Sequence, residues 1–291
     1  MAAKHEAWLK LTMEDPIDPD LPICDPHHHL WDKPDSRYLL EDLLRDTGAG
    51  HNIVRTVHVE CRSMYREDGP EEMKPVGETE FVEAIAAGGA SGQHGTTTVA
   101  AGIVGFADLT LGAAVEAVLE AHIAAGRARF RGIRHISIWD ASPDIISNMR
   151  APKLLSDPKF REGFACLQKH GLSFDAWLHH TQIMELVDLA KAFPDTTIIL
   201  DHVGTPLGVG PYAGKRKEVF QGWKRGIAAL AGCPNVAVKL GGLGMERCGF
   251  GWNKRTTPPG SAELAQTMAP YFLWCIEQFG VERCMFESNF P

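Results

Sequence analysis

Short apolar runs alternate with longer segments of helical periodicity along most of this 291-residue sequence. Eight runs have the length and composition of buried strands: residues 23–29, 55–61, 98–106, 132–139, 172–179, 197–202, 236–240 and 284–287. Two parallel strands need a crossover of a dozen or more residues between them, usually a helix. The alternation therefore indicates repeated βα units. Eight such units predict an α/β fold, a (β/α)8 TIM barrel, rather than an open sheet.

The segments between these runs have the spacing of amphipathic helices. Apolar residues stand at i, i+3, i+4 and i+7 in two of them: Ile183, Leu186, Val187 and Ala190, and Phe272, Cys275, Ile276 and Phe279. Ser156-Asp157-Pro158 has the pattern of a helix cap followed by proline in the first turn. No GxGxxG follows the first predicted strand and no GxxxxGK[ST] occurs, so the dinucleotide-binding and P-loop interpretations lose their usual support.

The predicted barrel accounts for most of the chain, since such barrels take roughly 250 residues. We expect residues 1–20 to form an N-terminal extension and residues 21–291 to form the barrel. The sequence reaches Pro291 directly after the eighth predicted strand. We therefore expect a barrel without its last helix, truncated at the C-terminus. Alternatively, the N-terminal segment or a partner covers the outer face of that strand.

Charge and cysteine content argue against several classes of protein. The net charge is -8 and the pI is about 5.9, whereas nucleic acids and anionic membranes require a basic face. The seven cysteines include no CxxC pair, so neither a disulfide scaffold nor a structural zinc site is expected. No stretch reaches the ~18 apolar residues of a membrane-spanning helix, and residues 1–10 lack the apolar core of a signal peptide. These features predict a cytoplasmic location.

Histidines gather at the end of the first predicted strand, in Asp25-Pro26-His27-His28-His29. Because successive strand residues point to opposite faces, His27 and His29 share a face and His28 lies on the other. Two imidazoles at the end of one strand can bind a divalent metal ion, or they can donate hydrogen bonds to a substrate carbonyl or carboxylate. The alternative is that this histidine-rich strand end is solvated and loop-like and takes no part in chemistry.

The second predicted strand alternates in the same way. Val57 and Val59 share one face, and His58 and Glu60 share the other. With the valines facing the helices, His58 and Glu60 would lie in the barrel lumen. Glu60 lies nearer the mouth and is the stronger candidate for chemistry, whereas either residue can belong to a satisfied polar network in the core.

Further polar residues interrupt the later strands. In the fourth predicted strand either Arg134 or His135 faces inward, and the pattern does not choose between them. Arg134 can clamp a carboxylate with two parallel hydrogen bonds or form a barrel salt bridge. Lys239 interrupts an apolar run, so it needs a partner such as Glu60 or Asp201, or else binds substrate. His179-His180 ends the fifth predicted strand and His202 ends the sixth, where barrel enzymes carry their active sites. One of His179 and His180 is expected near the pocket, and we take His180 as the candidate.

Five segments, in this order, carry a family resemblance: Asp25-Pro26-His27-His28-His29-Leu30-Trp31-Asp32, Gly132-Ile133-Arg134, Asp201-His202-Val203-Gly204-Thr205-Pro206, Val238-Lys239-Leu240-Gly241-Gly242-Leu243 and Met285-Phe286-Glu287-Ser288-Asn289-Phe290-Pro291. The chain resembles the amidohydrolase superfamily, in particular the amidohydrolase-related group that contains lactonases and some decarboxylases. The resemblance implies a (β/α)8 barrel. It also implies that His27 and His29 are the paired histidines of strand one and that His202 is the strand-six histidine.

The resemblance has one departure at the eighth strand. The family places a catalytic Asp there, in a Ser-Asp-Trp-Pro type motif, and this chain has Asn289 at that position. Asn cannot take a proton from water and is a weak neutral ligand. We therefore expect Asn289 to orient a water or a substrate oxygen, with Glu60 or His202 as the base. His27, His29 and His202 are the candidate ligands for one divalent ion, zinc or manganese, which need not be obligatory.

These residues predict a hydrolase that opens a small lactone or related cyclic ester at the C-terminal face of the barrel. The histidines would polarise the carbonyl, and Arg62, Arg134, His180 and Lys239 would bind a carboxylated substrate. The long loops 62–77 and 241–261 would shape the pocket. Two alternatives stay open: a metal-dependent decarboxylase of the same fold, and a ligand-binding barrel that has lost catalysis. The expected partner is a small molecule, and a homo-oligomer is an open alternative to a monomer.

Overall fold

The computed structural model describes residues 7–34, 36–88, 97–147 and 152–291. Its main element is an 8-stranded parallel sheet in the order β1-β4-β5-β6-β7-β8-β9-β10. The strands are β1 (Ile23–His28), β4 (Ile53–Val59), β5 (Thr98–Gly105), β6 (Phe130–Arg134), β7 (Ser173–Ala176), β8 (Ile198–Leu200), β9 (Val236–Leu240) and β10 (Cys284–Phe286). Each overlaps one of the eight predicted runs. The prediction of a (β/α)8 barrel is therefore confirmed.

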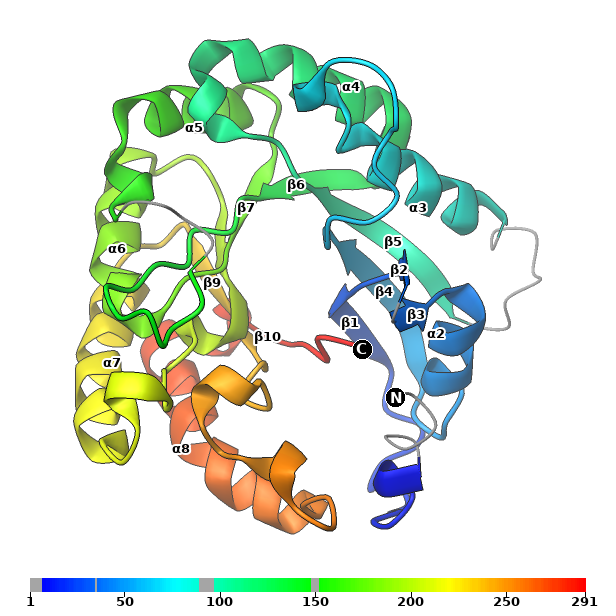
Figure 1. Ribbon diagram of the computed structural model, residues 1–291, viewed down its shortest axis with the longest axis vertical. Coiled ribbons are helices and arrows are strands. Elements are labelled where there is room, and N and C mark those ends of the chain that lie inside the picture. The colour runs from blue at the N-terminus through cyan, green and yellow to red at the C-terminus, as the bar shows by residue number, and fades with distance from the viewer. Residues whose placement is uncertain (1–6, 35, 89–96, 148–151) are drawn as a thin grey trace.

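The sheet closes between its first and last strands. The segment after β10 runs beside β1, where His29 N donates to Phe290 O at 2.8 Å and Asn289 N donates to His27 O at 2.9 Å. Figure 1 shows this segment passing inside the ring of strands towards β1. Because closure brings residues 289 and 290 against residues 27 and 29, the first and the last of the five family motifs lie next to each other in the structure.

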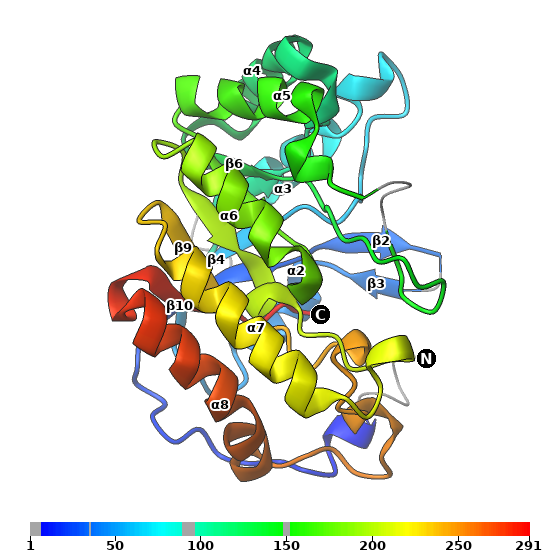
Figure 2. The same cartoon turned by 90° about the vertical axis from the view of Figure 1, so that its left-hand side faces the viewer.

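Helices form the outer layer of the barrel (Figure 1). They are α2 (Leu40–Thr47), α3 (Val76–Gly88), α4 (Glu116–Gly126), α5 (Pro158–Lys169), α6 (Ile183–Ala192), α7 (Arg216–Ala231) and α8 (Ser261–Phe279). The predicted cap of α5 is confirmed, since the Asp157 carboxylate accepts from the backbone N–H groups of Lys159 and Phe160 at 2.8 and 3.0 Å. Figure 2 shows α6, α7 and α8 lying side by side on one flank.

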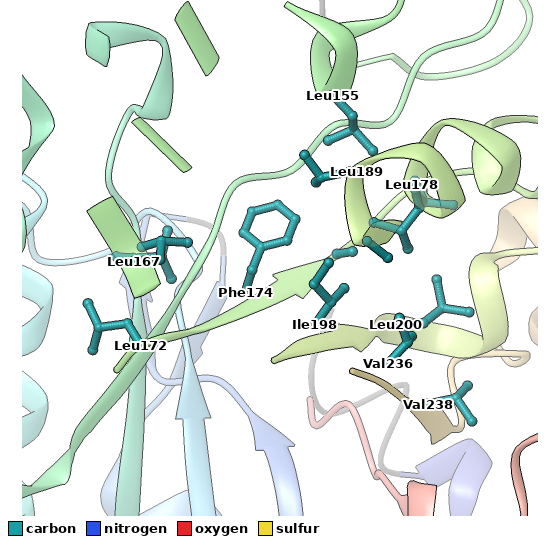
Figure 3. Close-up of a cluster of buried hydrophobic side chains, with 14 of the residues drawn as sticks. Leu155, Leu167, Leu172, Phe174, Leu178, Leu189, Ile198, Leu200, Val236 and Val238 are labelled. Carbon is teal, nitrogen blue, oxygen red and sulfur yellow. The ribbon is translucent and has the colours of Figure 1, made fainter. Parts of the chain in front are cut away.

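The hydrophobic core lies between the strands and this helical layer. Figure 3 shows Phe174 of β7 and Ile198 of β8 pointing towards Leu167 and Leu189 of the neighbouring helices, and all four are buried. Apolar side chains from β7, β8 and β9 thus face outwards to the helices. The opposite faces of these strands are left to line the lumen, where the polar residues lie.

Three features of the structure go beyond the predicted elements. A short antiparallel hairpin, β2 (Trp31–Lys33) and β3 (Ser36–Tyr38), follows β1, and the Trp31 ring stacks on His29 with centroids 6.1 Å apart. The N-terminal segment contacts the first residue of α8, where Glu14 accepts from Ser261 N at 2.8 Å. The run Leu109–Arg129 is long and apolar enough to cross a membrane, by length and composition only. It comprises three successive helical segments with a non-helical Gly112, packed in the outer layer.

One prediction about β4 is wrong. His58 does not face the lumen: its Nε2 lies 3.4 Å from Glu78 Oε1 of α3, in the outer layer. Its ring also packs edge-on against that of His28, with centroids 5.6 Å apart. Glu60 nevertheless contacts Arg134 in the lumen, as predicted. The two-residue alternation fails because β4 ends at Val59, so Glu60 lies outside the strand and its direction is free of that constraint.

Candidate active site

His27 is the centre of a polar cluster at the C-terminal ends of the strands. Its side chain is fully buried, and its ring lies 5.0 Å from that of His29 and 4.8 Å from that of His202, between centroids. Arg134 Nη1 lies 3.1 Å from its Nε2, and Lys239 Nζ lies 3.2 Å from its Nδ1. Since His27 touches groups from β1, β6, β8 and β9, its position depends on closure of the whole barrel.

A turn after β8 positions His202. β8 ends at Leu200, and His202 then takes a left-handed backbone conformation with φ 56°. Gly242, after β9, packs directly against it, since a Cβ added there would lie 2.4 Å from His202 Cβ. The turn brings His202 to Glu287, whose Oε1 accepts from the backbone N–H at 3.0 Å and lies 2.7 Å from Nδ1.

Glu287 joins two of the three predicted histidines. Its Oε1 bonds His202, and its Oε2 lies 2.8 Å from His27 Nδ1. The carboxylate is fully buried. A carboxylate that holds Nδ1–H of an imidazole leaves Nε2 as the basic nitrogen and stabilises the ring when it takes a proton. The Glu287–His202 pair therefore has the arrangement of a general base and the group that orients it.

Two buried cations bind carboxylates around these histidines. Lys239 Nζ contacts Asp175 Oδ2 at 2.6 Å and Asp201 Oδ1 at 3.0 Å. Arg134 Nε contacts Glu60 Oε1 at 2.8 Å, and Arg134 Nη1 lies 3.6 Å from Asp201 Oδ2. Together with Glu287, four carboxylates face two cations, which leaves two negative charges in excess.

Burial and charge together set the protonation of these groups. Burial, with help from Lys239, holds the pKa of His27 well below its usual value, and burial does the same for His29, so both rings are neutral. Burial raises the pKa of Asp175 to about 6, against the opposing effect of Lys239. Burial alone would lower the pKa of Lys239, but Asp175 and Asp201 outweigh it and raise that pKa.

The side chains present are compatible with a divalent metal ion. One ligand atom each from His27, His202 and Glu287 lie within 4.8 Å of one another. Glu287 Oε2 is buried, its near neighbour is the neutral His27 ring at 2.8 Å, and the excess negative charge favours a cation. Two imidazoles and a carboxylate are a common ligand set for catalytic zinc. A bound ion would polarise a substrate carbonyl and lower the pKa of a water molecule there.

His29 and Asn289 lie together at the edge of this cluster. His29 Nδ1 is 2.7 Å from Val59 O, and its Nε2 is 3.3 Å from Asn289 Oδ1. Since a carbonyl oxygen only accepts, Nδ1 carries the proton of the neutral ring. Nε2 is then an acceptor, so the Asn289 amide bonds to it by turning its NH2 group towards the ring. His29 is outside the three-residue ligand group defined by the distances above.

Two predicted substrate-binding residues lie farther out. Arg62 is exposed on the loop after β4, close enough to Glu60 for its charge to oppose the rise in the pKa of Glu60 that burial causes. His180 is half-buried in the short helical turn before α6 and packs edge-on against Tyr212, at 5.3 Å. His180 also lines a cavity of about 580 Å³ between α6 and α7, which includes none of the lumen residues.

Sequence reasoning missed four residues of the cluster: Asp175, Trp177, Arg247 and Glu287. Trp177 packs edge-on against His202, and the guanidinium groups of Arg134 and Arg247 lie over its ring at 5.3 and 5.0 Å. Glu287 could have been found, because it is a carboxylate at the end of the eighth strand, two residues before Asn289. Arg247 could not have been found from the sequence, because its position depends on how the loop after β9 folds over the mouth of the barrel.

Comparison with known proteins identifies the family of this chain. The amidohydrolase family matches residues 24–291. The uncharacterized protein y4mH of Sinorhizobium fredii is 34% identical, over 94% of this chain and 86% of its own length. The L-fucono-1,5-lactonase of Burkholderia ambifaria is 25% identical, over 79% and 72%. A crystal structure of an amidohydrolase from Burkholderia multivorans with bound zinc superposes with a TM-score of 0.68 at 21% identity, over 93% and 85%. This chain therefore belongs to the amidohydrolase family, in its lactonase-like group, and is a hydrolase.

Proposed function

We propose that this hydrolase opens a small lactone or related cyclic ester that carries a carboxylate. The observation that carries the proposal is the buried Glu287 carboxylate bonded to His202 Nδ1 beside His27. His202 takes the proton from the attacking water at Nε2, and Glu287 holds the ring in that tautomer. The similarity to a lactonase supports a cyclic ester as the substrate class.

Arg247 is our candidate for binding the substrate carboxylate. Its guanidinium lies half-buried over Trp177, and its Nη1 is 3.5 Å from His179 Nε2. Within the described parts of the chain, no carboxylate lies within 4.0 Å of it. A half-buried guanidinium without an acidic partner at the mouth of a site is suited to bidentate binding of a carboxylate. Arg134 and Lys239, in contrast, already bind Glu60, Asp175 and Asp201.

The central test is hydrolysis of a lactone panel by the purified chain, with paired lactones that carry or lack a carboxylate. We expect ring opening, with kcat lowered about 10²- to 10⁴-fold in Glu287→Gln because the base loses its orienting group. Glu282→Gln, an exposed change near the same strand, is the control and should keep wild-type kcat. If no lactone is hydrolysed by the wild type, with or without added zinc or manganese, the proposal fails.

Arg247→Met separates binding of the carboxylate from the chemistry. We expect it to raise KM for the carboxylated lactone of each pair and to leave KM for the neutral one unchanged. Arg255→Met, which breaks an exposed ion pair with Glu263, is the matched control. An equal rise in KM for both members of a pair would contradict this role of Arg247.

A chelator decides between two roles of His202. If activity survives chelation, His202 acts as the base; if chelation abolishes activity and zinc or manganese restores it, His202 is a ligand of that ion together with His27 and Glu287. His27, His202 and Glu287 are compatible with either role of His202, and hydrolysis of a lactone is the expected reaction in both cases. A cytoplasmic location and the oligomeric state stay predictions from the sequence.

One observation favours a second candidate, a ligand-binding barrel. Asn289, where the family has Asp, faces His29 at 3.3 Å and has no basic capacity. Asn289→Asp tests it: a large gain in lactone hydrolysis would identify a decayed enzyme, whereas a loss would identify Asn289 as a working residue. Both Asn and Asp tolerate the φ of 60° at this position, so the exchange leaves the backbone unstrained.

A further inference from the structure

A second buried polar cluster lies outside the lumen, between β4 and α3. It consists of His58 of β4, Cys61 just after β4, and Glu78 in the first turn of α3. Cys61 Sγ lies 3.2 Å from Glu78 Oε1, which also accepts from Cys61 N at 2.8 Å. None of the three contacts His27, His202 or Glu287, so the cluster is distinct from the candidate active site.

The polar atoms of this cluster are poorly satisfied. His58 is fully buried, and neither of its ring nitrogens has a hydrogen-bond partner among the described residues. Glu78 is 3% exposed, and its Oε2 likewise has none. Within the same residues no Lys or Arg lies within 4.0 Å of the Glu78 carboxylate; the one ion-pair contact is His58 Nε2 at 3.4 Å. Buried groups of this kind destabilise a fold unless a further partner binds them.

The spacing of the three groups matches a metal site. One ligand atom from each lies within 4.8 Å of the others. Zinc binds nitrogen and oxygen at about 2.0–2.2 Å and sulfur at about 2.3 Å, so tetrahedral ligand atoms are about 3.4–3.6 Å apart. The separations of 3.4 Å for His58 Nε2 and 3.2 Å for Cys61 Sγ, each to Glu78 Oε1, are close to these values. The carbonyl oxygen of Leu30, 3.3 Å from Sγ, is in range as a fourth ligand.

We propose that His58, Cys61 and Glu78 bind one thiophilic divalent cation, zinc, as a structural site that joins the end of β4 to the start of α3. A dication with a thiolate, a carboxylate and a neutral imidazole has zero net charge, which suits a buried location. Binding displaces the thiol proton of Cys61 to solvent, and the sulfur forms a bond to the metal. The site would anchor the loop that begins at Arg62. The absence of a CxxC motif from the sequence does not exclude it, because the fold brings these ligands together.

Without metal, Cys61 stays protonated. Burial, with the nearby charge of Glu78, raises the pKa of its thiol. A coordinated thiol is deprotonated outright by the cation, so metal binding should release protons. This feature favours a thiophilic cation over magnesium or calcium, which take oxygen ligands.

Cobalt substitution tests the proposal, because a thiolate bound to Co²⁺ gives a strong sulfur-to-cobalt charge-transfer absorption. The full chain is freed of metal with a chelator and titrated with Co²⁺ alone. We expect the absorption to saturate at one equivalent per chain beyond any Co²⁺ that the lumen binds, and to vanish in Cys61→Ser. Cys166→Ser is the matched control and should keep it, since the Cys166 thiol contacts a carbonyl of its own helix at 3.7 Å. Glu287→Gln should also keep it, which separates this site from the lumen.

Two further variants guard against misfolding of Cys61→Ser. His58→Gln and Glu78→Gln keep the thiol, and each should weaken Co²⁺ binding at least tenfold in the same titration. Zn²⁺ should raise the Tm of the wild type and of Cys166→Ser by more than that of Cys61→Ser, in which only the lumen site remains. The proposal is overturned if the wild type shows no sulfur-to-cobalt absorption in excess Co²⁺, or if that absorption persists in Cys61→Ser.

Discussion

Replacing Lys239 with methionine tests whether this buried cation holds the lumen together or binds substrate. Lys239 is 1% exposed and lies 2.6 Å from Asp175 and 3.0 Å from Asp201. Methionine has a similar length but no charge, so Lys239→Met leaves two buried carboxylates facing each other without their shared cation. Removing one partner of a buried ion pair costs about 3–5 kcal/mol. For a chain of this size we expect a fall in Tm on the order of 10 °C.

The loss should depend on pH. Burial already raises the pKa of Asp175 to about 6, and removal of Lys239 raises it further. A carboxyl whose folded-state pKa lies above the unfolded value stabilises the fold at low pH and loses that contribution as the pH rises through the folded-state pKa. The Tm difference between the wild type and Lys239→Met should therefore be smaller at pH 5 than at pH 8. Adding Asp175→Asn to Lys239→Met should restore part of the stability at pH 8.

The assay is thermal unfolding at both pH values, combined with the lactone kinetics. Lys254→Met is the matched control, since Lys254 forms an exposed pair with Glu246 at 2.9 Å that should contribute at most about 1 kcal/mol. A loss of stability in Lys239→Met no larger than in Lys254→Met would refute the structural role. If KM then rose in the stable Lys239→Met protein, the lysine would be a substrate-binding residue instead.

Two further substitutions probe the positioning of His202 and a buried histidine of the outer layer. Gly242→Ala places a methyl group against His202 at a φ of 71°, so we expect a loss of more than about 2 kcal/mol in stability and a loss of most lactonase activity. Gly244→Ala is the control and should leave both unchanged, because no atom lies within 4 Å of a Cβ added there. Equal effects of the two substitutions would contradict the contact between Gly242 and His202. Burial lowers the pKa of His122 to about 4, so its contribution is present above pH 6.5 and lost as the pH falls to 4, about 3 kcal/mol in all. His122→Gln should flatten the pH dependence of the unfolding free energy by about that amount, and parallel curves would show that His122 has no part in it.

The predictions that succeeded depended on local patterns. Each strand is a short apolar run bounded by a helical segment, and this alternation is visible within a window of a few residues. The cap at Asp157 and the helices around residues 183–190 and 272–279 succeeded for the same reason. His27 and His202 could be placed at strand ends without knowing their neighbours, because in a parallel barrel all the C-terminal strand ends lie on one face.

The contacts that these residues make with one another could not be predicted from local sequence patterns. The assignment of His58 to the lumen failed because it assumed that His58 and Glu60 share a face, whereas β4 ends at Val59 and Glu60 lies beyond it. The place of Glu287 at the end of the eighth strand makes it a candidate from the sequence, but only the structure shows that its carboxylate contacts His202 and His27.

By itself, the sequence determined the number and order of the strands, the outer apolar faces and the position of the histidines at the mouth. Only the tertiary structure decided that Lys239 binds Asp175 and Asp201, that Glu287 joins His27 to His202, and that Asn289 faces His29. The physical reason is sequence distance. These partners are separated by up to 260 residues. Glu287 and Asn289 reach His27 and His29 only when β10 closes against β1. Closure fixes the stagger of all eight strands at once, and that stagger sets which buried charge finds which partner.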